Sequence, residues 1–168
     1  MPFVVTLKVD GDSAIIQLFN HLLGYDKQAM LDDIGAYGVD SSTQRFLNQS
    51  DVNGNPWKIS WRAKLQGRRN KDGVASSGET GRDTSQLLSG LHHNVLANGV
   101  EWGSDKEYSI PFHFGAHILP KTGQYLVFNV GGNWRKVKEV NIPSRTFLGV
   151  NAEDDEEILN IIGRHLSG

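Results

Sequence analysis

Two histidines in the chain stand at a spacing that can bind a metal ion. His113 and His117 are four residues apart, so in a helix they would share one face, as two zinc ligands do. The segment between them lacks the glutamate general base of zinc peptidases, and Pro111 and Pro120 flank it against a long helix. We therefore predict histidines packed in a turn, with no bound metal or cofactor. A metal-dependent hydrolase that uses this pair is the alternative.

A second feature is a concentration of positive charge. Residues 58–71 contain six basic residues and no acidic residue, whereas the whole chain carries a formal net charge of −2. Trp57 and Trp61 are interleaved with these cations, a combination that suits contact with a nucleic-acid backbone without base specificity. Glycine and serine continue the segment, so we expect a flexible basic loop at about 58–82. The cations are Lys58, Arg62, Lys64, Arg68, Arg69 and Lys71.

This basic segment has two interpretations. As a functional feature, it contacts DNA or an acidic partner, and a monomeric nucleic-acid-binding accessory protein is then an alternative function for the chain. As a structural feature, it is a solvated charge run that only keeps the loop soluble.

The common catalytic and nucleotide-binding motifs are missing from the sequence. It has no G-x-S-x-G elbow, no G-x-x-x-x-G-K-[ST] loop and no G-x-G-x-x-G fingerprint. It also has no cysteine, which excludes a disulfide framework, a thiolate metal site and a cysteine nucleophile. The acidic run at 153–157 lacks the alternating ligands and central glycine of a calcium loop, and the start of a helix explains it. We therefore predict that the protein is not an enzyme.

The length and composition are typical of one folded domain. The chain has 168 residues, of which 38% are hydrophobic, and its net charge is small, unlike that of disordered chains. The N-terminus lacks a basic segment followed by a long apolar run, and no apolar run is long enough to span a membrane. We expect a single domain over residues 1–168 with no membrane partner.

Hydrophobic spacing and turn residues predict the elements that must position these side chains. We expect a strand over residues 3–9 and a helix over about 15–23, followed by a second helix from about 30 to 48. The glycines at 35 and 38 weaken the middle of that second helix. Residues 51–56 predict an exposed turn. A helical turn is expected at 83–88, capped by Asp83 or Thr84.

The second half of the chain predicts two hairpins and a final helix. Asn98-Gly99 and the segment 131–133 each lie between β-like runs, which is typical of hairpin turns. Asn151 is expected to cap a helix whose first turns are acidic. Together these elements predict an α+β fold, with a mainly antiparallel sheet packed by the N-terminal helices and by this C-terminal amphipathic helix. The helix residues expected to pack on the sheet are Ile158, Leu159, Ile161, Ile162 and Leu166.

Taken in order, several short motifs resemble those of the phage virion morphogenesis family, also called the tail completion family. The most specific is IPSRTFLGV at 142–150, which is similar to the family's IPARPFLGL and departs from it mainly at Ser144 and Thr146. Ser85 also stands where the family usually has glycine. The resemblance covers about residues 30–166. It rests on the order of the short motifs, which follow one another along the chain as they do in the family. The other matching segments are 34–35, 42–46, 54–57, 83–91, 100–104 and 108–115.

The resemblance implies a structural virion component that acts in tail completion and head–tail joining, as a tail terminator or neck component. It implies a homo-oligomeric ring, with sixfold symmetry to match a contractile tail, that contacts tail tube, sheath and head–tail connector proteins. The protein would be assembled in the host cytoplasm and would lie in the virion. The positive charge of the basic loop leaves two contacts open there, an acidic partner surface or the genomic DNA without sequence specificity.

A candidate subunit interface lies within the most specific motif. Phe147 and Leu148 are apolar and follow Arg145 in a stretch that Pro143 and Gly149 hold extended. Either they anchor a neighbouring subunit, as buried aromatic and arginine residues do at interfaces, or they pack in the core of their own chain.

Overall fold

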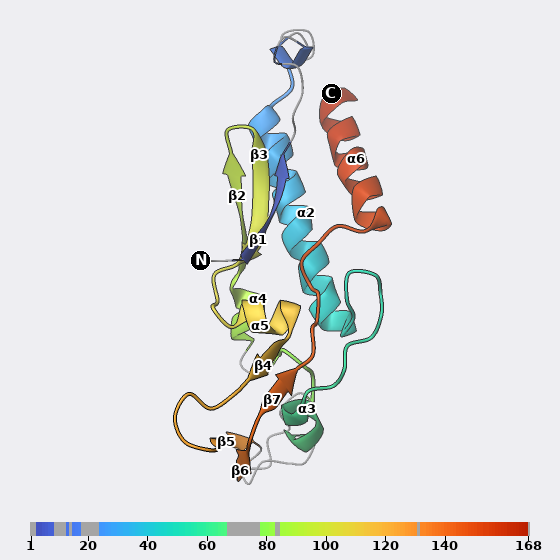
Figure 1. Cartoon of the computed structure of the whole chain (residues 1–168). Coiled ribbons are helices and arrows are strands. Elements are labelled where there is room, and N and C mark those ends of the chain that lie inside the picture. The colour runs from blue at the N-terminus through green and yellow to red at the C-terminus, as the bar shows by residue number, and fades with distance from the viewer. Residues whose placement is uncertain are drawn as a thin grey trace.

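The computed structural model combines helices with antiparallel strand pairs, so the predicted α+β class is confirmed (Figure 1). It describes residues 3–8, 13, 15–17, 24–66, 78–82, 85–130 and 132–167. Of the helix expected over 15–23, residues 15–17 are helical, and the remainder lies outside the described residues. Asp83 and Thr84 also lie outside them, and the expected cap is wrong, because the helical turn there begins at residue 86 and has Ser85 at its N-cap position.

The first sheet joins an N-terminal strand to a hairpin from the middle of the chain. Strand β1 (Phe3–Lys8) pairs with β3 (Gly99–Ser104), which also pairs with β2 (Leu91–Leu96), in the order β1-β3-β2. The hairpin predicted at Asn98-Gly99 is confirmed, but Leu96 pairs with Gly99, so Ala97 and Asn98 form the turn. Neither of them has a positive φ, so the turn does not use the left-handed preference of an Asn-Gly pair. Instead, Lys27 Nζ donates to Ala97 O (3.3 Å) and to Asn98 Oδ1 (3.0 Å).

Helix α2 (Lys27–Asn48) packs along this sheet and confirms the predicted second helix (Figure 1). Asp26 caps it, because its Oδ1 accepts from the backbone N–H groups of residues 28 and 29 at 2.9 and 3.1 Å. The helix continues through both glycines because the sheet occupies the space of a side chain. A Cβ at Gly35 would lie 2.5 Å from the His93 ring, and one at Gly38 would lie 2.5 Å from the Trp102 ring. The glycines therefore permit close packing of helix on sheet.

Helix α6 (Ala152–Ser167) follows Asn151, whose Oδ1 accepts from Asp154 N at 2.8 Å, so the predicted cap is confirmed. The expectation that this helix packs on the sheet is wrong, because it packs against the opposite side of α2 and makes α2 the middle layer of three (Figure 1). Ile158 and Ile161 are buried there. Leu159, expected in the same stripe, points away and is 66% exposed.

The remaining elements lie beyond one end of these layers (Figure 1). They are the short helices α3 (Trp61–Gln66), α4 (Gln86–Ser89) and α5 (Ser109–Phe114) and two small sheets. In one sheet, β4 (Ala116–Ile118) pairs with β7 (Val140–Ile142). In the other, β5 (Leu126–Val130) and β6 (Asn133–Val137) form the second predicted hairpin, with Val130 opposite Asn133. The described strands thus form three separate sheets rather than one.

An aromatic cluster joins this end to the layers. Phe46 comes from the last turn of α2, Phe112 from α5 and Phe147 from the segment before α6, and Trp57 follows the turn after α2. The Phe46 ring centroid lies 5.1 Å from that of Trp57, 5.6 Å from that of Phe112 and 5.0 Å from that of Phe147. Because Phe46 and Phe147 are completely buried, the cluster fixes the extended segment 143–149 against α2.

Candidate interaction surface

A buried arginine connects two of the motif segments quoted above and also forms an ion pair with the last helix. Arg45 lies on the buried face of α2, and its Nη2 donates to Asp154 Oδ2 in the first turn of α6. Its Nη1 donates to the carbonyl oxygens of Phe147 and Gly149, each at 2.9 Å. Both charged side chains are buried. A buried guanidinium requires such partners, so the arginine holds the segment before α6 to α2.

Both carboxylate oxygens of Asp154 accept hydrogen bonds. Its Oδ1 accepts from Tyr37 Oη (3.1 Å) and Ser41 Oγ (2.5 Å), both on α2, and its Oδ2 accepts from Asn151 N at 2.9 Å. Burial, together with the neighbouring Asp154 carboxylate, raises the pKa of Tyr37 to about 12. The phenol therefore stays protonated and donates. Sequence reasoning explained Asp154 only as part of an acidic helix start and missed this network.

The three residues proposed as a subunit interface are in the interior of the chain. Arg145, Phe147 and Leu148 are all buried. The Arg145 guanidinium donates from Nε and Nη2 to the carbonyl oxygen of Lys58, at 3.1 and 2.9 Å, and burial lowers its pKa. Their burial supports the core alternative. Arg145 instead fixes the start of the basic segment.

The basic segment begins with helix α3 rather than with the flexible loop expected at 58–82. The side chain of Ala63 is buried, and Ser60 Oγ accepts from Ala63 N at 3.1 Å, which holds the first turn of the helix. Arg62 Nη2 donates to the carbonyl oxygen of Glu79 at 3.1 Å. Lys58 and Lys64 are exposed. The other three predicted contact residues, Arg68, Arg69 and Lys71, lie outside the described residues.

A groove runs between this segment and strand β7. It has a volume of about 680 Å³, and it brings Lys58, Arg62 and Lys64 together with Arg145, which the sequence placed in a separate candidate site. Two large apolar side chains at the groove are open to solvent, since Trp61 is 74% exposed and Ile59 is 58% exposed. An exposed tryptophan among cations is typical of a binding surface rather than of a free loop. We call this feature the basic groove.

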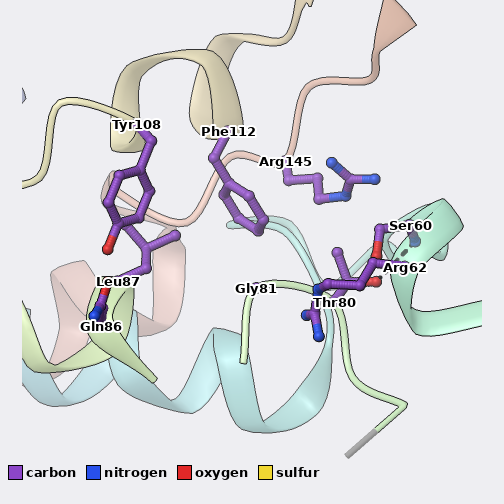
Figure 2. Close-up of a pocket in the computed structure, with 9 residues that line it drawn as sticks. All are labelled: Ser60, Arg62, Thr80, Gly81, Gln86, Leu87, Tyr108, Phe112 and Arg145. Atoms are coloured by element: carbon purple, nitrogen blue, oxygen red, sulfur yellow. Dashed lines mark hydrogen bonds between the residues drawn. The ribbon is translucent and has the colours of Figure 1, made fainter. Parts of the chain in front are cut away.

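A smaller cleft of about 270 Å³ adjoins the basic groove and shares Ser60, Arg62 and Arg145 with it (Figure 2). Figure 2 shows Phe112 between Tyr108 and Arg145, with Ser60 and Arg62 on the facing side. The Arg145 guanidinium lies 5.3 Å from the Phe112 ring centroid. The two cations that border this cleft, Arg62 and Arg145, already donate to carbonyl oxygens of the chain. We therefore treat the cleft as an extension of the basic groove and not as a separate site.

The two histidines proposed as a metal pair lie on different elements. His113 lies in the last turn of α5 and is buried. His117 lies on β4, is exposed and has its Nε2 2.9 Å from Glu139 Oε2. The shared helical face that the alternative metal pair would need does not form, because the helix stops at Gly115, whose φ of 78° lies in a region that favours glycine. Among the described residues, no group of three or more His, Cys, Asp or Glu side chains is arranged to hold a metal ion.

Burial keeps His113 neutral. Desolvation, with a smaller contribution from the charge of Arg45, lowers the pKa of His113 from 6.5 to about 4. The Nδ1 atom of the neutral imidazole accepts hydrogen bonds from the backbone N–H groups of Phe147 and Leu148, at 3.4 and 3.5 Å. His113 therefore supports the same extended segment as Arg45 does.

Of the helices in the described residues, none is long and apolar enough to cross a membrane.

Comparison with protein families identifies the class of protein. The model of the phage virion morphogenesis family matches residues 11–167, which is nearly the whole chain. The chain belongs to this family, so it is a virion-associated protein with a role in assembling the phage particle. Comparisons with curated proteins and with solved structures found no match.

Proposed function

We propose that the protein acts in tail completion and head–tail joining, as a non-enzymatic ring component of the tail end or neck. Family membership over residues 11–167 carries the proposal. The molecule supports it with a rigid internal frame, built from the Arg45–Asp154 pair and the aromatic cluster, and with an exposed cationic and aromatic groove at one end. Such a frame suits a component that must hold an exposed surface in a fixed position for contact with other molecules. The ring is proposed to be hexameric, next to tail tube, sheath and connector proteins.

The basic groove is proposed to contact either an acidic surface of a neighbouring neck protein or the DNA that passes through the ring. A ring multiplies the charge of each groove by the number of subunits, which concentrates positive potential around its axis. Contact with passing DNA must remain nonspecific, and phosphate attraction meets that need because salt weakens it strongly. A nucleic-acid-binding accessory role is the second candidate function, and the cations beside Trp61 favour it.

Removing the exposed cations of this segment should impair particle production without unfolding the protein. A variant with Lys58 and Lys64 both replaced by serine is expected to keep its free energy of unfolding within roughly 0.5 kcal/mol per site, as is usual for surface positions. The yield of infectious particles, measured by plaque counts after complementation of a phage that lacks the protein, should fall.

The matched control replaces Lys121 and Lys138, two exposed lysines outside the groove, and should leave the plaque count unchanged. Duplex DNA binding at increasing salt then separates the two partners. If the groove variant binds duplex DNA more weakly than the native chain does, the partner of the groove is DNA. If the two bind DNA equally well, the partner is a protein surface. A normal plaque count from the groove variant would mean that these residues are only a solvated charge run and contact no partner.

A further inference from the structure

The β5–β6 hairpin presents an unpartnered face. Residues directly opposite each other on antiparallel strands point to the same side, so Val127 shares a side with Lys136 and Asn129 shares it with Trp134. Tyr125 continues this side, because Lys136 Nζ lies 4.2 Å from the centroid of its ring. Trp134 is 74% exposed and Val127 is 61% exposed. We call these five residues the hairpin face.

The opposite side of the hairpin packs against the rest of the molecule. Leu126, Phe128 and Val130 alternate with the exposed residues of β5 and are half-buried, and β5 lies beside α3. A two-stranded hairpin is marginally stable by itself, and it is stabilised when a further element covers it. The hairpin face therefore has the composition of an interface, with tryptophan and tyrosine beside a cation, and nothing in the described chain covers it.

Helix α6 presents a surface with complementary chemistry. Its outer side, away from α2, carries Leu159, with Asp155 and Glu156 one turn before it, and all three are exposed. Residues 152–159 contain five acidic residues and no basic one, whereas residues 121–138, which include the hairpin, contain four basic residues and no acidic one. We call Asp155, Glu156 and Leu159 the α6 outer face. An apolar residue bordered by carboxylates fits an apolar surface bordered by lysine.

The two faces lie far apart, with the hairpin beyond one end of the layers and α6 alongside α2 (Figure 1). One chain cannot join its own faces, but two copies can. Charge complementarity therefore favours a second copy of this chain as the occupant. Duplex DNA offers phosphates for Lys136 but no apolar surface to cover Trp134 and Val127, and it would be repelled by the acidic helix.

We propose that the α6 outer face of one copy docks on the hairpin face of the next. Leu159 packs against Trp134 and Val127, while Asp155 and Glu156 face Lys136. The contact joins two different faces, so it is heterologous and repeats from copy to copy, which closes into a ring when the rotation permits. This inference rests on the proposed ring and assigns the surfaces that build it. The apolar contacts supply most of the affinity, and the charges set the register.

A charge-exchange experiment tests the contact. One variant carries Asp155→Lys and Glu156→Lys, and the other carries Lys136→Glu. Each variant alone sets like charges against each other, so its concentration for half assembly, measured by sedimentation, should rise at least about tenfold. A 1:1 mixture should assemble again, because both contacts of an alternating oligomer then join opposite charges. The matched control, Asp40→Lys, changes an exposed acidic residue of α2 outside both faces and should assemble as the native chain does.

A Leu159→Ser variant tests the apolar part, because this exposed leucine can be lost without unfolding the helix. It should weaken assembly while its thermal unfolding stays native. Native assembly by either charge variant alone, or a mixture that remains monomeric, would overturn the proposed contact and leave the tail completion role standing. A native chain that stays monomeric would also overturn it, and normal virions formed without the protein would separately refute the proposed function.

Discussion

Replacing Arg45 by methionine is expected to lower the free energy of unfolding by about 3–5 kcal/mol. The methionine keeps most of the side-chain volume but leaves the Asp154 carboxylate buried without its cation. It also removes the donor that satisfies the carbonyl oxygens of Phe147 and Gly149. A domain of this kind is stable by only about 5–15 kcal/mol, so the loss is a large fraction of the total. Urea unfolding followed by circular dichroism measures it.

The matched control is Arg164→Met, on an arginine of α6 whose side chain is 63% exposed and bonded to Glu157. Its effect should stay within about 0.5 kcal/mol. Asp154→Asn and the double variant complete a cycle, in which the double variant should lose less than the sum of the two single losses. Equal unfolding free energies for Arg45→Met and Arg164→Met would show that the buried pair does not hold α6 to α2.

The second large effect is expected in acid. The folded protein keeps His113 neutral down to a pKa of about 4, whereas the unfolded chain protonates it near 6.5. The unfolded state therefore binds more protons between these values, so the stability is intact above pH 6.5 and falls as the pH drops from 6.5 to 4. The full loss is about 3 kcal/mol, since each pKa unit corresponds to about 1.4 kcal/mol.

Thermal unfolding measured at intervals across this range checks the prediction. A His113→Phe variant keeps a ring in the aromatic cluster but cannot titrate, so this part of the acid sensitivity should disappear. The control is His117→Gln, on an exposed histidine, which should leave the acid sensitivity in place. A pH profile that is the same in the native and His113→Phe proteins would mean that His113 is not responsible.

The elements that were predicted correctly are those with local signals. Helix α2, both hairpins and α6 were found from spacing, turn residues and the Asn151 cap. The docking of α6 was wrong because an apolar stripe shows that a helix face is buried but not what buries it. The separation into three sheets depends on pairings such as Val5 with Trp102, and no local pattern encodes those.

The candidate site was predicted only in part. The cations of the basic groove were found by their charge, but the six-residue helix α3 is too short for its periodicity to be recognised. Arg45 and Asp154 were missed because 109 residues separate them. A signal was nevertheless present, since Arg45 continues the buried stripe of Ile34, Gly38 and Ser42 along α2. An arginine in such a stripe requires buried hydrogen-bond acceptors, and an acidic side chain is one kind that can supply them.

The central claim is that this family member completes the tail and joins it to the head. Negative-stain electron microscopy of a lysate from a phage that lacks the protein tests that claim most directly. We predict filled heads and tails that remain separate, with tails of irregular ends, and joined particles again when the native chain is supplied from a plasmid. Joined virions of normal appearance in the lysate that lacks the protein would contradict the account.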